Sequence, residues 1–338
     1  MAENPHTKYS LPDRTYQGIV RSELKKMAEQ AGFSGHRLGE VEIIIAEITS
    51  NLVKHTLKGG EILARILVAP SAGIEFISID NGPGMNRPDR MMEDGLSTSN
   101  TLGQGLGAIR RLSNVFDLYS LPGWGTIVYS RIYTDKKFTL PEQTMEISSI
   151  SVCKKNETLC GDLWTCTKNE KRYRLAIIDG LGHGASANEA AKTAVECFVM
   201  APKNTPVEEL RFLHENLKKT RGGVVTVAYI DEINQQITYS GVGNITMKIV
   251  SNSRTQGCMS YNGIVGHIMP ASLNNHMTKM EKKTDALVMH SDGLSARWDI
   301  QKYPGILIHP GVVLCAALYK DFDRGNDDST ILVAKFVK

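Results

Sequence analysis

The chain contains two sets of residues whose types and spacing suit phosphate chemistry. The first set begins with Glu47 and Asn51, continues with a D-N-G-P-G segment at 80–84, and ends in a glycine-rich run at 103–107. The second set consists of aspartates in tight turns between positions 161 and 328. Glycine-rich turns that open a helix suit nucleotide phosphates, whereas clustered carboxylates suit divalent cations. We therefore expect one site that moves phosphate onto a partner and another that removes it.

Glu47 and Asn51 are four positions apart in a helix that the apolar periodicity predicts over 36–57, so they share one helix face. That face is otherwise apolar, with isoleucines and leucines on both sides of the pair. Two interpretations stay open from these residues alone. The pair is either a solvent-facing helix edge or part of a polar site.

Asp80 ends an apolar strand predicted over 74–80, and Gly82 and Gly84 follow it closely. A carboxylate in this place can accept a hydrogen bond from an adenine amino group, and glycines allow the backbone to approach the base. An ordinary Asp-Asn-Gly turn is the alternative. The later glycine-rich run opens a helix predicted over 106–114, where exposed N–H groups favour phosphate. It is not a Rossmann fingerprint, because no strand leads directly into it.

The second set lies at the ends of apolar strands. Strands predicted over 173–178 and 286–290 lead into Asp179 and Asp292, and further acids stand at Asp162 and in the pair Asp327 and Asp328. Several carboxylates brought together repel one another unless hard cations neutralise them. Since no His/Cys cluster competes in the sequence, Mg²⁺ or Mn²⁺ fits better than Zn²⁺. Each aspartate taken singly could instead stabilise an ordinary turn.

The elements that must position these residues fall into two groups. In the first part, helices are predicted over 15–31, 36–57 and 106–114, and strands over 61–69, 74–80, 115–121 and 126–133. Residues 1–10 are polar and expected to be mobile, and residues 134–145 are polar and predicted to be a linker. From 146 on, strands are predicted over 147–153, 162–167, 173–178, 224–230, 237–241, 246–250, 286–290 and 330–336, with helices over 185–200, 206–220 and 310–320. This excess of strands favours an antiparallel β-sandwich covered by helices over a parallel sheet.

Composition narrows the class of protein. The 338 residues are enough for two domains, and 41% hydrophobic with 22% charged residues is typical of a globular protein. The net charge of +3 is not clustered, so no nucleic-acid partner is expected. The sequence has neither a secretory signal nor an apolar segment long enough to cross a membrane, which predicts a cytoplasmic protein without a membrane partner. The six cysteines form no C-x-x-C pair and are expected to be free thiols in a reducing compartment.

The order E-x-x-x-N, D-N-G-P-G-M, G-x-G-x-G and G-x-G-T resembles the ATPase fold of the GHKL superfamily. The segment M-E-D-G-L-S-T-S at 92–99, followed by L-G-Q-G-L at 102–106, is most similar to the RsbT branch of the anti-sigma kinases. The resemblance implies an α/β sandwich of the GHKL (Bergerat) type over residues 10–133, with ATP and Mg²⁺ as cofactors. RsbT-type kinases phosphorylate Ser or Thr of STAS-domain proteins.

This resemblance implies a role for each matching residue. Glu47 would be the general base that takes the proton from the acceptor hydroxyl, and Asn51 would hold Mg²⁺ on the phosphates. Asp80 would bind adenine. Gly82 and Gly84 would lie beside the adenine, and Thr126 would support the same end of the site. The residues that would contact the phosphates are Gly103, Gly105, Leu106 and Gly107. Residues 86–104 would form a lid ordered by ATP.

The second set has a resemblance of its own. The order G-D at 161, D-G-L-G-H-G at 179, S-D-G-L at 291 and D-D-S-T at 327 resembles metal-dependent protein phosphatases of the PPM class, in their SpoIIE branch, and the domain looks most like RsbX. The resemblance implies a β-sandwich flanked by helices over residues 146–338. Its binuclear metal site would use Asp162, Asp179, the Gly180 carbonyl, Asp292 and Asp327, with a bridging water that attacks phosphoserine. Asp327 is preferred to Asp328 because the first acid of this motif takes the metal in relatives.

His183 follows the Asp179 motif closely, and two roles stay open for it: acting near the leaving group or bracing the turn. Taken together, the α+β chain is expected to be a bifunctional regulator of a bacterial partner-switching or stress-response pathway. It would phosphorylate and dephosphorylate a STAS-domain partner of the anti-sigma-antagonist or stressosome type. The alternatives are an anti-sigma module that holds a sigma factor, an ATP sensor that regulates the phosphatase, or one inactive domain. A homodimer is a further expectation from relatives of the kinase domain.

Overall fold

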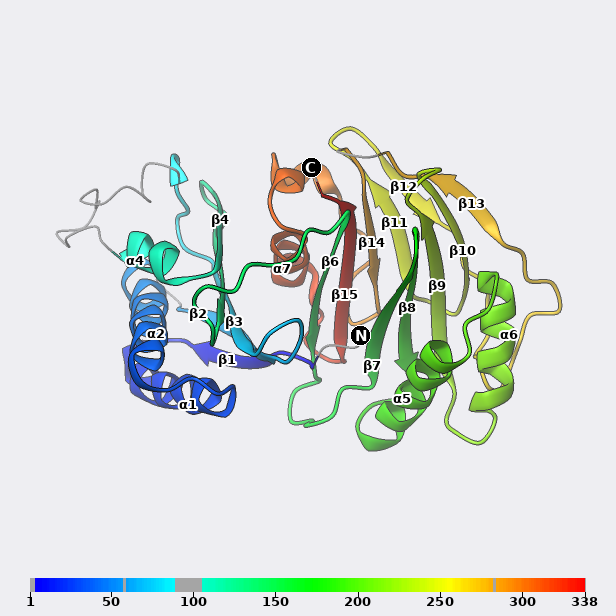
Figure 1. Cartoon of the computed structure of the whole chain (residues 1–338), viewed down its shortest axis with the longest axis horizontal. Coiled ribbons are helices and arrows are strands. Elements are labelled where there is room, and N and C mark those ends of the chain that lie inside the picture. Colours follow the sequence, from blue (N-terminus) through cyan, green and yellow to red (C-terminus); the bar gives the residue numbers. More distant parts are fainter. Residues whose placement is uncertain (1–3, 57–58, 89–104, 282–283, 338) are drawn as a thin grey trace. The chain divides into compact units, whose positions relative to one another are not determined.

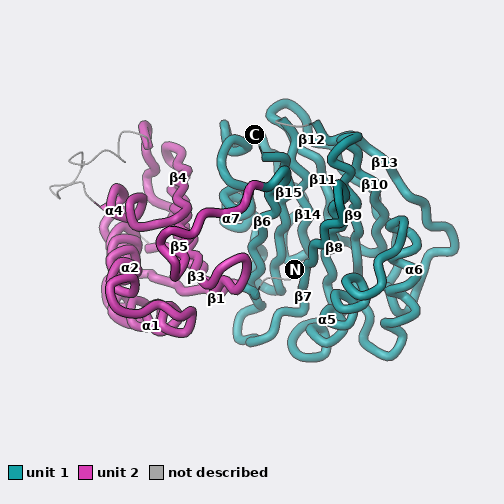
Figure 2. The backbone as a smooth tube through the Cα atoms, viewed as in Figure 1, with its two compact units in different colours: residues 1–5, 143–338 teal, residues 6–142 magenta. Residues whose placement is uncertain are grey.

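The computed structural model describes residues 4–56, 59–88, 105–281 and 284–337. The chain divides into two compact units, shown in different colours in Figure 2. We call His6–Glu142 the N-terminal unit, and Met1–Pro5 with Gln143–Lys338 the C-terminal unit. Each unit is described by itself.

The N-terminal unit is one antiparallel sheet with helices on one face (Figure 1). Its strands run in the order β1-β2-β3-β5-β4. The elements are β1 (Thr7–Leu11), β2 (Gly60–Leu67), β3 (Gly73–Asp80), β4 (Val115–Leu121), β5 (Gly125–Tyr133), α1 (Gln17–Gln30), α2 (Gly35–His55), α4 (Gly105–Leu112) and the 3₁₀ turn η1 (Arg14–Tyr16). The predicted helices and strands of this part are thus confirmed to within a few residues.

The core of this unit forms between the apolar helix stripes and one face of the sheet. Ile44 and Ile48 of α2 lie in one cluster with Phe76 of β3 and Ile109 of α4. The spacing of four residues places both isoleucines on the same helix face, and the strand alternation supplies the facing side chains. Because α2 packs on both β3 and α4, its polar positions are held close to the ends of those elements.

The first residues of the chain, predicted to be mobile, include an edge strand. β1 pairs antiparallel with β2, and Lys8 forms an ion pair with Glu61 at 2.7 Å. Leu11 is buried in the core of the unit and Tyr9 packs against it. A short polar strand carries little intrinsic β signal. It forms here because the edge of β2 offers a row of backbone groups that require partners.

Glu75 in β3 is the centre of a buried charged cluster. It pairs with Arg65 at 2.7 Å and Arg131 at 2.6 Å, the Tyr129 hydroxyl donates to it at 2.9 Å, and His6 Nε2 lies 3.1 Å away. Burial alone would raise the pKa of Glu75, but the positive charges of Arg65 and Arg131 hold that pKa well below its usual range. The carboxylate is therefore ionised at neutral pH and compensates both arginines.

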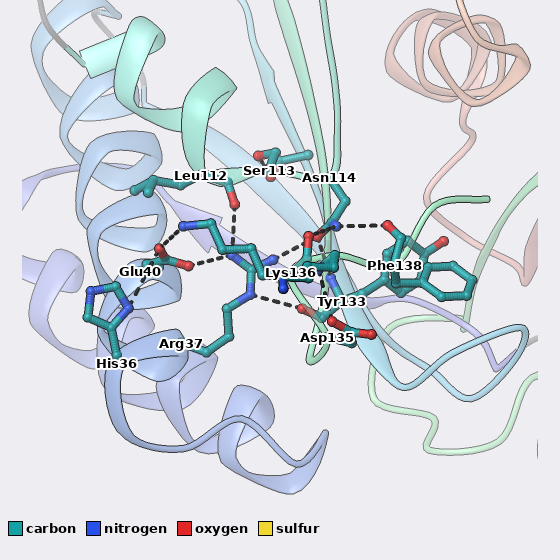
Figure 3. A network of polar contacts seen from close by, with 12 residues as sticks. His36, Arg37, Glu40, Leu112, Ser113, Asn114, Tyr133, Asp135, Lys136 and Phe138 are labelled. Atoms are coloured by element: carbon teal, nitrogen blue, oxygen red, sulfur yellow. Dashed lines mark hydrogen bonds and ion pairs between the residues drawn. The ribbon is translucent and has the colours of Figure 1, made fainter.

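Arg37, near the start of α2, ties together distant parts of the N-terminal unit (Figure 3). Its guanidinium donates to the Leu112 carbonyl at 3.1 Å and to Asn114 Oδ1 at 2.7 Å. Asn114 Nδ2 in turn donates to the carbonyls of Lys136 at 3.1 Å and Phe138 at 3.2 Å. These hydrogen bonds fix the first residues of the predicted linker to the segment that follows α4, within the N-terminal unit.

The C-terminal unit consists of two five-stranded antiparallel sheets, ordered β13-β10-β9-β8-β7 and β12-β11-β14-β15-β6 (Figure 1). Its strands are β6 (Met145–Val152), β7 (Asp162–Asn169), β8 (Arg172–Gly180), β9 (Gly223–Asp231), β10 (Gln236–Val242), β11 (Thr246–Val250), β12 (Thr255–Cys258), β13 (His276–Lys279), β14 (Ala286–His290) and β15 (Ser329–Phe336). Its helices are α5 (Ala185–Met200), α6 (Pro206–Leu217), α7 (Gly311–Phe322), and the short 3₁₀ turns η2 (Ile300–Lys302) and η3 (Ile306–Ile308).

The alternation along β8 shows how the layers of this unit arise. Leu175 and Ile177 point into the core between the two sheets, whereas Ala176 and Ile178 lie in the cluster under α5 and α6. A strand buried on both faces reads as a continuous apolar run, as β8 does. α7 packs on β6 and β15 of the other sheet. The predicted sandwich with helices on it is confirmed. Among the described strands of this unit, the short β12 and β13 were absent from the prediction.

Candidate functional site

Glu47 and Asn51 lie beside the glycine that opens α4. Both side chains are half-buried. A β-carbon built on Gly105 would overlap Glu47 Oε2 and would lie 3.9 Å from Asn51 Oδ1. Any side chain at this position would therefore displace the acid. The first N–H groups of a helix have no partner within it, so the acid and amide stand next to a place suited to phosphate.

Asp80, the last residue of β3, organises the turn that follows it. Its Oδ1 accepts from the backbone N–H of Gly82 at 2.7 Å and of Thr126 at 3.2 Å. Gly84 has a φ of +67°, and a β-carbon there would overlap the Leu121 carbonyl oxygen. A left-handed backbone in so close a contact requires glycine. The structure thus brings together the residues predicted for the adenine end.

Ser120 of β4 was not among the predicted site residues, although it joins both sides of this turn. Its hydroxyl donates to the Gly125 carbonyl at 2.8 Å and accepts from the Met85 N–H at 2.9 Å. Because its single hydrogen is thereby used, the Thr126 hydroxyl, 3.0 Å away, donates to it. A serine in an alternating strand gives no motif signal, so only the fold reveals this contact.

The remaining residues predicted for the phosphate end are placed differently. Leu106 is half-buried and packs against the core of the N-terminal unit, and Gly107 is buried within α4. Gly103 lies outside the described residues, as does the predicted lid from position 89 to 104. The roles predicted for Gly103, Leu106, Gly107 and the lid stay predictions.

The predicted metal ligands lie where strand ends of the two sheets meet. Asp162 opens β7 and is the register partner of Asp179 near the end of β8. Asp292 follows β14, and Asp327 precedes β15. These two strands pair with each other in the second sheet, which does not contain β7 and β8. β7 and β15 are in contact. Acids far apart in the sequence are therefore gathered at one end of the sandwich.

The electrostatics of this cluster show that the acids act on one another. Burial, followed by the negative charges of Asp292, Asp327 and Asp328, raises the pKa of Asp179 to about 7. Burial and the charge of Asp179 raise the pKa of Asp162 well above its usual range. Asp162 Oδ2 is buried and has no hydrogen-bond partner among the described residues. An oxygen-only set with an unmet demand for positive charge fits hard divalent cations.

Gly180, the predicted carbonyl ligand, is where α5 approaches the end of β8. Its N–H donates to the Gly161 carbonyl at 3.1 Å. A β-carbon on Gly180 would overlap the Ala187 carbonyl oxygen. The turn that follows needs glycine at Gly182 and Gly184, whose φ angles are +87° and +73°. The glycines of the D-G-L-G-H-G motif therefore permit the sharp turn of the backbone from β8 into α5.

Asp327 and Asp328 have different surroundings. Asp328 is buried, and its two oxygens accept the backbone N–H groups of Lys154 at 2.7 Å and Gly161 at 2.8 Å. Asp327 is half-buried, and its Oδ1 accepts only the neighbouring Asp328 N–H in the described contacts, at 3.0 Å. Asp328 therefore fixes the backbone in front of Asp162, and Asp327 stays the predicted ligand.

Two further residues hold the acids in place and were not predicted. Asn244 Nδ2 donates to Asp292 Oδ2 at 2.8 Å. The Ser291 hydroxyl accepts the Thr330 N–H at 3.0 Å, and its proximity to Asp162 opposes the rise in the pKa of that acid. Asn244 ends a G-V-G-N segment that is visible in the sequence, and its spacing from the acidic motifs is the signal that could have marked it.

Both His183 and His290, the histidines next to the acidic motifs in the sequence, form hydrogen bonds. His183 is exposed, and its Nδ1 lies 2.7 Å from Glu157 Oε1, so it braces its turn, and a role near the leaving group stays a prediction. His290 accepts from Trp298 Nε1 at 2.9 Å through Nε2, so its Nδ1 carries the hydrogen and donates to the Ser291 carbonyl at 2.7 Å. Burial lowers the pKa of His290 to about 4, which keeps this packing group neutral.

The fold and the two sites define a kinase-like ATPase domain followed by a metal-dependent phosphatase domain. The family described as Stage II sporulation protein E (SpoIIE) matches residues 169–337, and the histidine kinase-like ATPase domain matches residues 10–131. The chain belongs to the SpoIIE family and carries an RsbT-type kinase-like ATPase domain in its N-terminal part. It is therefore an enzyme, a protein serine/threonine phosphatase of the SpoIIE type with a kinase-like domain, as both resemblances predicted.

Individual relatives match one domain each. The serine/threonine-protein kinase RsbT of Bacillus subtilis (strain 168) is 32% identical over 102 residues, which cover 30% of this chain and 77% of that protein. The phosphoserine phosphatase RsbX of the same organism is 27% identical over 147 residues, or 42% of this chain and 71% of that protein. A crystal structure of RsbX in complex with magnesium has a TM-score of 0.51 and 21% identity, covering 59% of this chain and 98% of that one.

The described part of the chain has no helix of sufficient length and apolar character to traverse a lipid bilayer.

Proposed function

We propose that this chain adds phosphate to, and removes it from, Ser or Thr side chains of a STAS-domain partner in a bacterial partner-switching pathway of the cytoplasm. One observation carries the proposal. Relatives of this chain are a serine/threonine kinase and a phosphoserine phosphatase that exist as separate proteins, and here both types are joined. Opposed activities in one chain give control over the phosphorylation state of a shared partner.

On the kinase side, ATP would supply the transferable phosphoryl group. Glu47 would accept the proton of the partner's hydroxyl as its oxygen attacks the γ-phosphorus, and ADP would leave. Asn51, one helix turn further on, would hold Mg²⁺ beside the same phosphates. The N–H groups at Gly105 favour the negative charge there, and the contact between Gly105 and Glu47 supports a short reach from base to phosphate.

On the phosphatase side, bound Mg²⁺ or Mn²⁺ would neutralise phosphate charge and make water a nucleophile at neutral pH. The residues that would hold the ions are Asp162, Asp179, the Gly180 carbonyl, Asp292 and Asp327. Asn244 orients Asp292, and Asp328 fixes the backbone that leads into Asp162. Such supporting contacts set the position of the carboxylates to a fraction of an ångström, on which metal affinity depends.

The test separates the two activities in the full chain. A STAS-domain protein recovered from native cells is incubated with radiolabelled ATP and the wild type, Glu47→Ala or Asp179→Asn chain. We expect Asp179→Asn to accumulate labelled partner and Glu47→Ala to add no label while still removing phosphate from pre-labelled partner. A partner that is never labelled, while ATP changes the phosphatase rate, would replace the kinase by an ATP sensor. Recovery of a sigma factor alone would make the N-terminal domain an anti-sigma module.

A further inference from the structure

Cys153 and Cys160 lie side by side next to the candidate metal site. Cys153 follows β6 directly, and Cys160 stands two positions before Asp162. The two Sγ atoms and a carboxylate oxygen of Asp328 all lie within 4.8 Å of one another. Both cysteines are free thiols in this structure. The loop between β6 and β7 thus begins and ends with sulfur atoms that face each other.

The contacts around this loop join the thiols to the acid cluster. Asp328 accepts the N–H of Lys154 at 2.7 Å and of Gly161 at 2.8 Å, which are the residues that directly follow each cysteine. Each Asp328 oxygen thus accepts one backbone N–H, and the carboxylate is held against both ends of the loop that carries the thiols. Asn188 of α5 also donates to the Cys160 carbonyl at 2.7 Å, which fixes that end of the loop.

The two thiols differ in access to solvent. Cys153 is half-buried, whereas Cys160 is only 1% exposed. A small oxidant can therefore reach Cys153, and Cys160 is shielded but close enough to react with it afterwards. An accessible thiol beside a second thiol is the arrangement in which oxidation ends in a disulfide.

We propose that peroxide converts Cys153 and Cys160 into a reversible disulfide that lowers phosphatase activity by disrupting the two hydrogen bonds that Asp328 accepts from the backbone in front of Asp162. The effect on activity rests on the proposed metal site, but the formation of the disulfide does not. An S–S bond is about 2.05 Å long, so the two sulfur atoms, which lie within 4.8 Å of each other, must approach to form it, and we expect the loop ends to be drawn with them. The backbone N–H groups of Lys154 and Gly161 move with them, and the position of Asp162 follows.

The chemistry balances with one peroxide per disulfide. The Cys153 sulfur attacks a peroxide oxygen, an S–O bond forms as the O–O bond breaks, and one water leaves with the thiol proton. The Cys160 sulfur then attacks the oxidised sulfur, the S–S bond forms, and the oxygen leaves as a second water with the Cys160 proton. Two thiols lose two electrons in total, and hydrogen peroxide gains them.

The experiment detects the disulfide by mass spectrometry and measures phosphatase activity in a separate assay. The full chain is treated with hydrogen peroxide, then with catalase, alkylated without reduction, and digested with trypsin. Cleavage after Lys154 and Lys155 places the cysteines on peptides 138–154 and 156–168, and Cys166→Ser removes the other cysteine of the second peptide. We expect these peptides to be cross-linked. Hydrolysis of p-nitrophenyl phosphate should fall about tenfold and return with dithiothreitol.

The variants make the result decisive. Cys153→Ser should keep its starting activity and lose its response to peroxide, whereas Cys258→Ser, at a half-buried thiol elsewhere, should respond like the wild type. Uncross-linked peptides, or equal inhibition of the Cys153→Ser chain, would overturn the proposal. A chain without any phosphatase activity before oxidation would contradict the proposed function instead, and the mass measurement would still decide whether the disulfide forms.

Discussion

The two candidate sites differ in the residues that shape them: clustered carboxylates in the C-terminal unit and glycines in the N-terminal unit. At the end of the β-sandwich, burial and the charges of the neighbouring carboxylates together raise the pKa of Asp179 to about 7. In the N-terminal unit, glycines leave room for neighbouring groups, Gly105 for the Glu47 carboxylate and Gly84 for the Leu121 carbonyl. The first arrangement requires a cation because like charges repel, and the second requires space. The sites should therefore fail in different ways when single residues are changed.

Asp179→Asn should give the largest effect, because it removes the acid on which the charges of its neighbours converge. Loss of a shared metal ligand costs several kcal/mol of transition-state stabilisation, so we expect phosphatase activity to fall about a thousandfold or more. Phosphorylation of the partner should be unchanged. Hydrolysis of p-nitrophenyl phosphate and transfer of label from ATP measure the two activities. Loss of both in a folded variant would mean that the sites are not independent.

Glu47→Ala should reverse this pattern. A positioned general base typically contributes about 10²- to 10⁴-fold, and we expect a loss of about 100-fold or more in phosphoryl transfer with phosphatase activity intact. Glu42→Ala is the matched control, since Glu42 lies on the same helix and pairs with Lys25 at the surface. The general-base role would be refuted if both substitutions reduced label transfer equally.

Glu75→Gln tests a part of the N-terminal unit that belongs to neither candidate site. Because the pKa of Glu75 is held well below its unfolded value of about 4.3, its ionised form stabilises the fold fully above that pH, and this contribution is lost as the pH falls towards the folded pKa. We expect the variant to lose about 3 kcal/mol of stability at pH 7, since Arg65 and Arg131 remain uncompensated. The difference from wild type should shrink below about pH 4.

Calorimetry of the full chain measures this change, with the N-terminal transition recognised by its upward shift when ATP is added. The groups that face Glu75 are His6, Arg65, Tyr129 and Arg131, and none of them is altered in the variant. Glu61→Gln serves as the control, because its surface pair with Lys8 should contribute less than about 1 kcal/mol. A penalty that is independent of pH would show that ionised Glu75 is not its source.

Asp328→Asn should have the smallest effect of the four. The residue supports the backbone in front of Asp162 through two N–H contacts and is not itself a predicted ligand. We expect the metal concentration for half-maximal phosphatase activity to rise about tenfold. Titration with Mg²⁺ and Mn²⁺ measures it and also shows which ion the site uses. If the metal requirement stayed the same, the distinction between Asp327 and Asp328 would lose its support.

The sequence predicts the elements that carry strong periodic signals. The apolar run of β8 and the amphipathic stripe of α2 are visible in single segments, and those of β8 and β14 place Asp179 near the end of one strand and Asp292 just after the other. β1 was not predicted, because a short polar edge strand depends on the edge of β2. The supporting contacts were not predicted either. Asp328 bonds to Lys154 and Gly161, which lie 174 and 167 positions away, and no local pattern encodes such a pair.

The proposed function requires that one chain carries two opposed activities on one partner. Its most direct test is the exchange of label with a STAS-domain protein captured from native cells, measured for the wild type, Glu47→Ala and Asp179→Asn chains. We expect the Asp179→Asn chain only to add label, the Glu47→Ala chain only to remove it, and the wild type to do both. A captured partner that neither gains nor loses phosphate with a folded chain, ATP and divalent metal would contradict it.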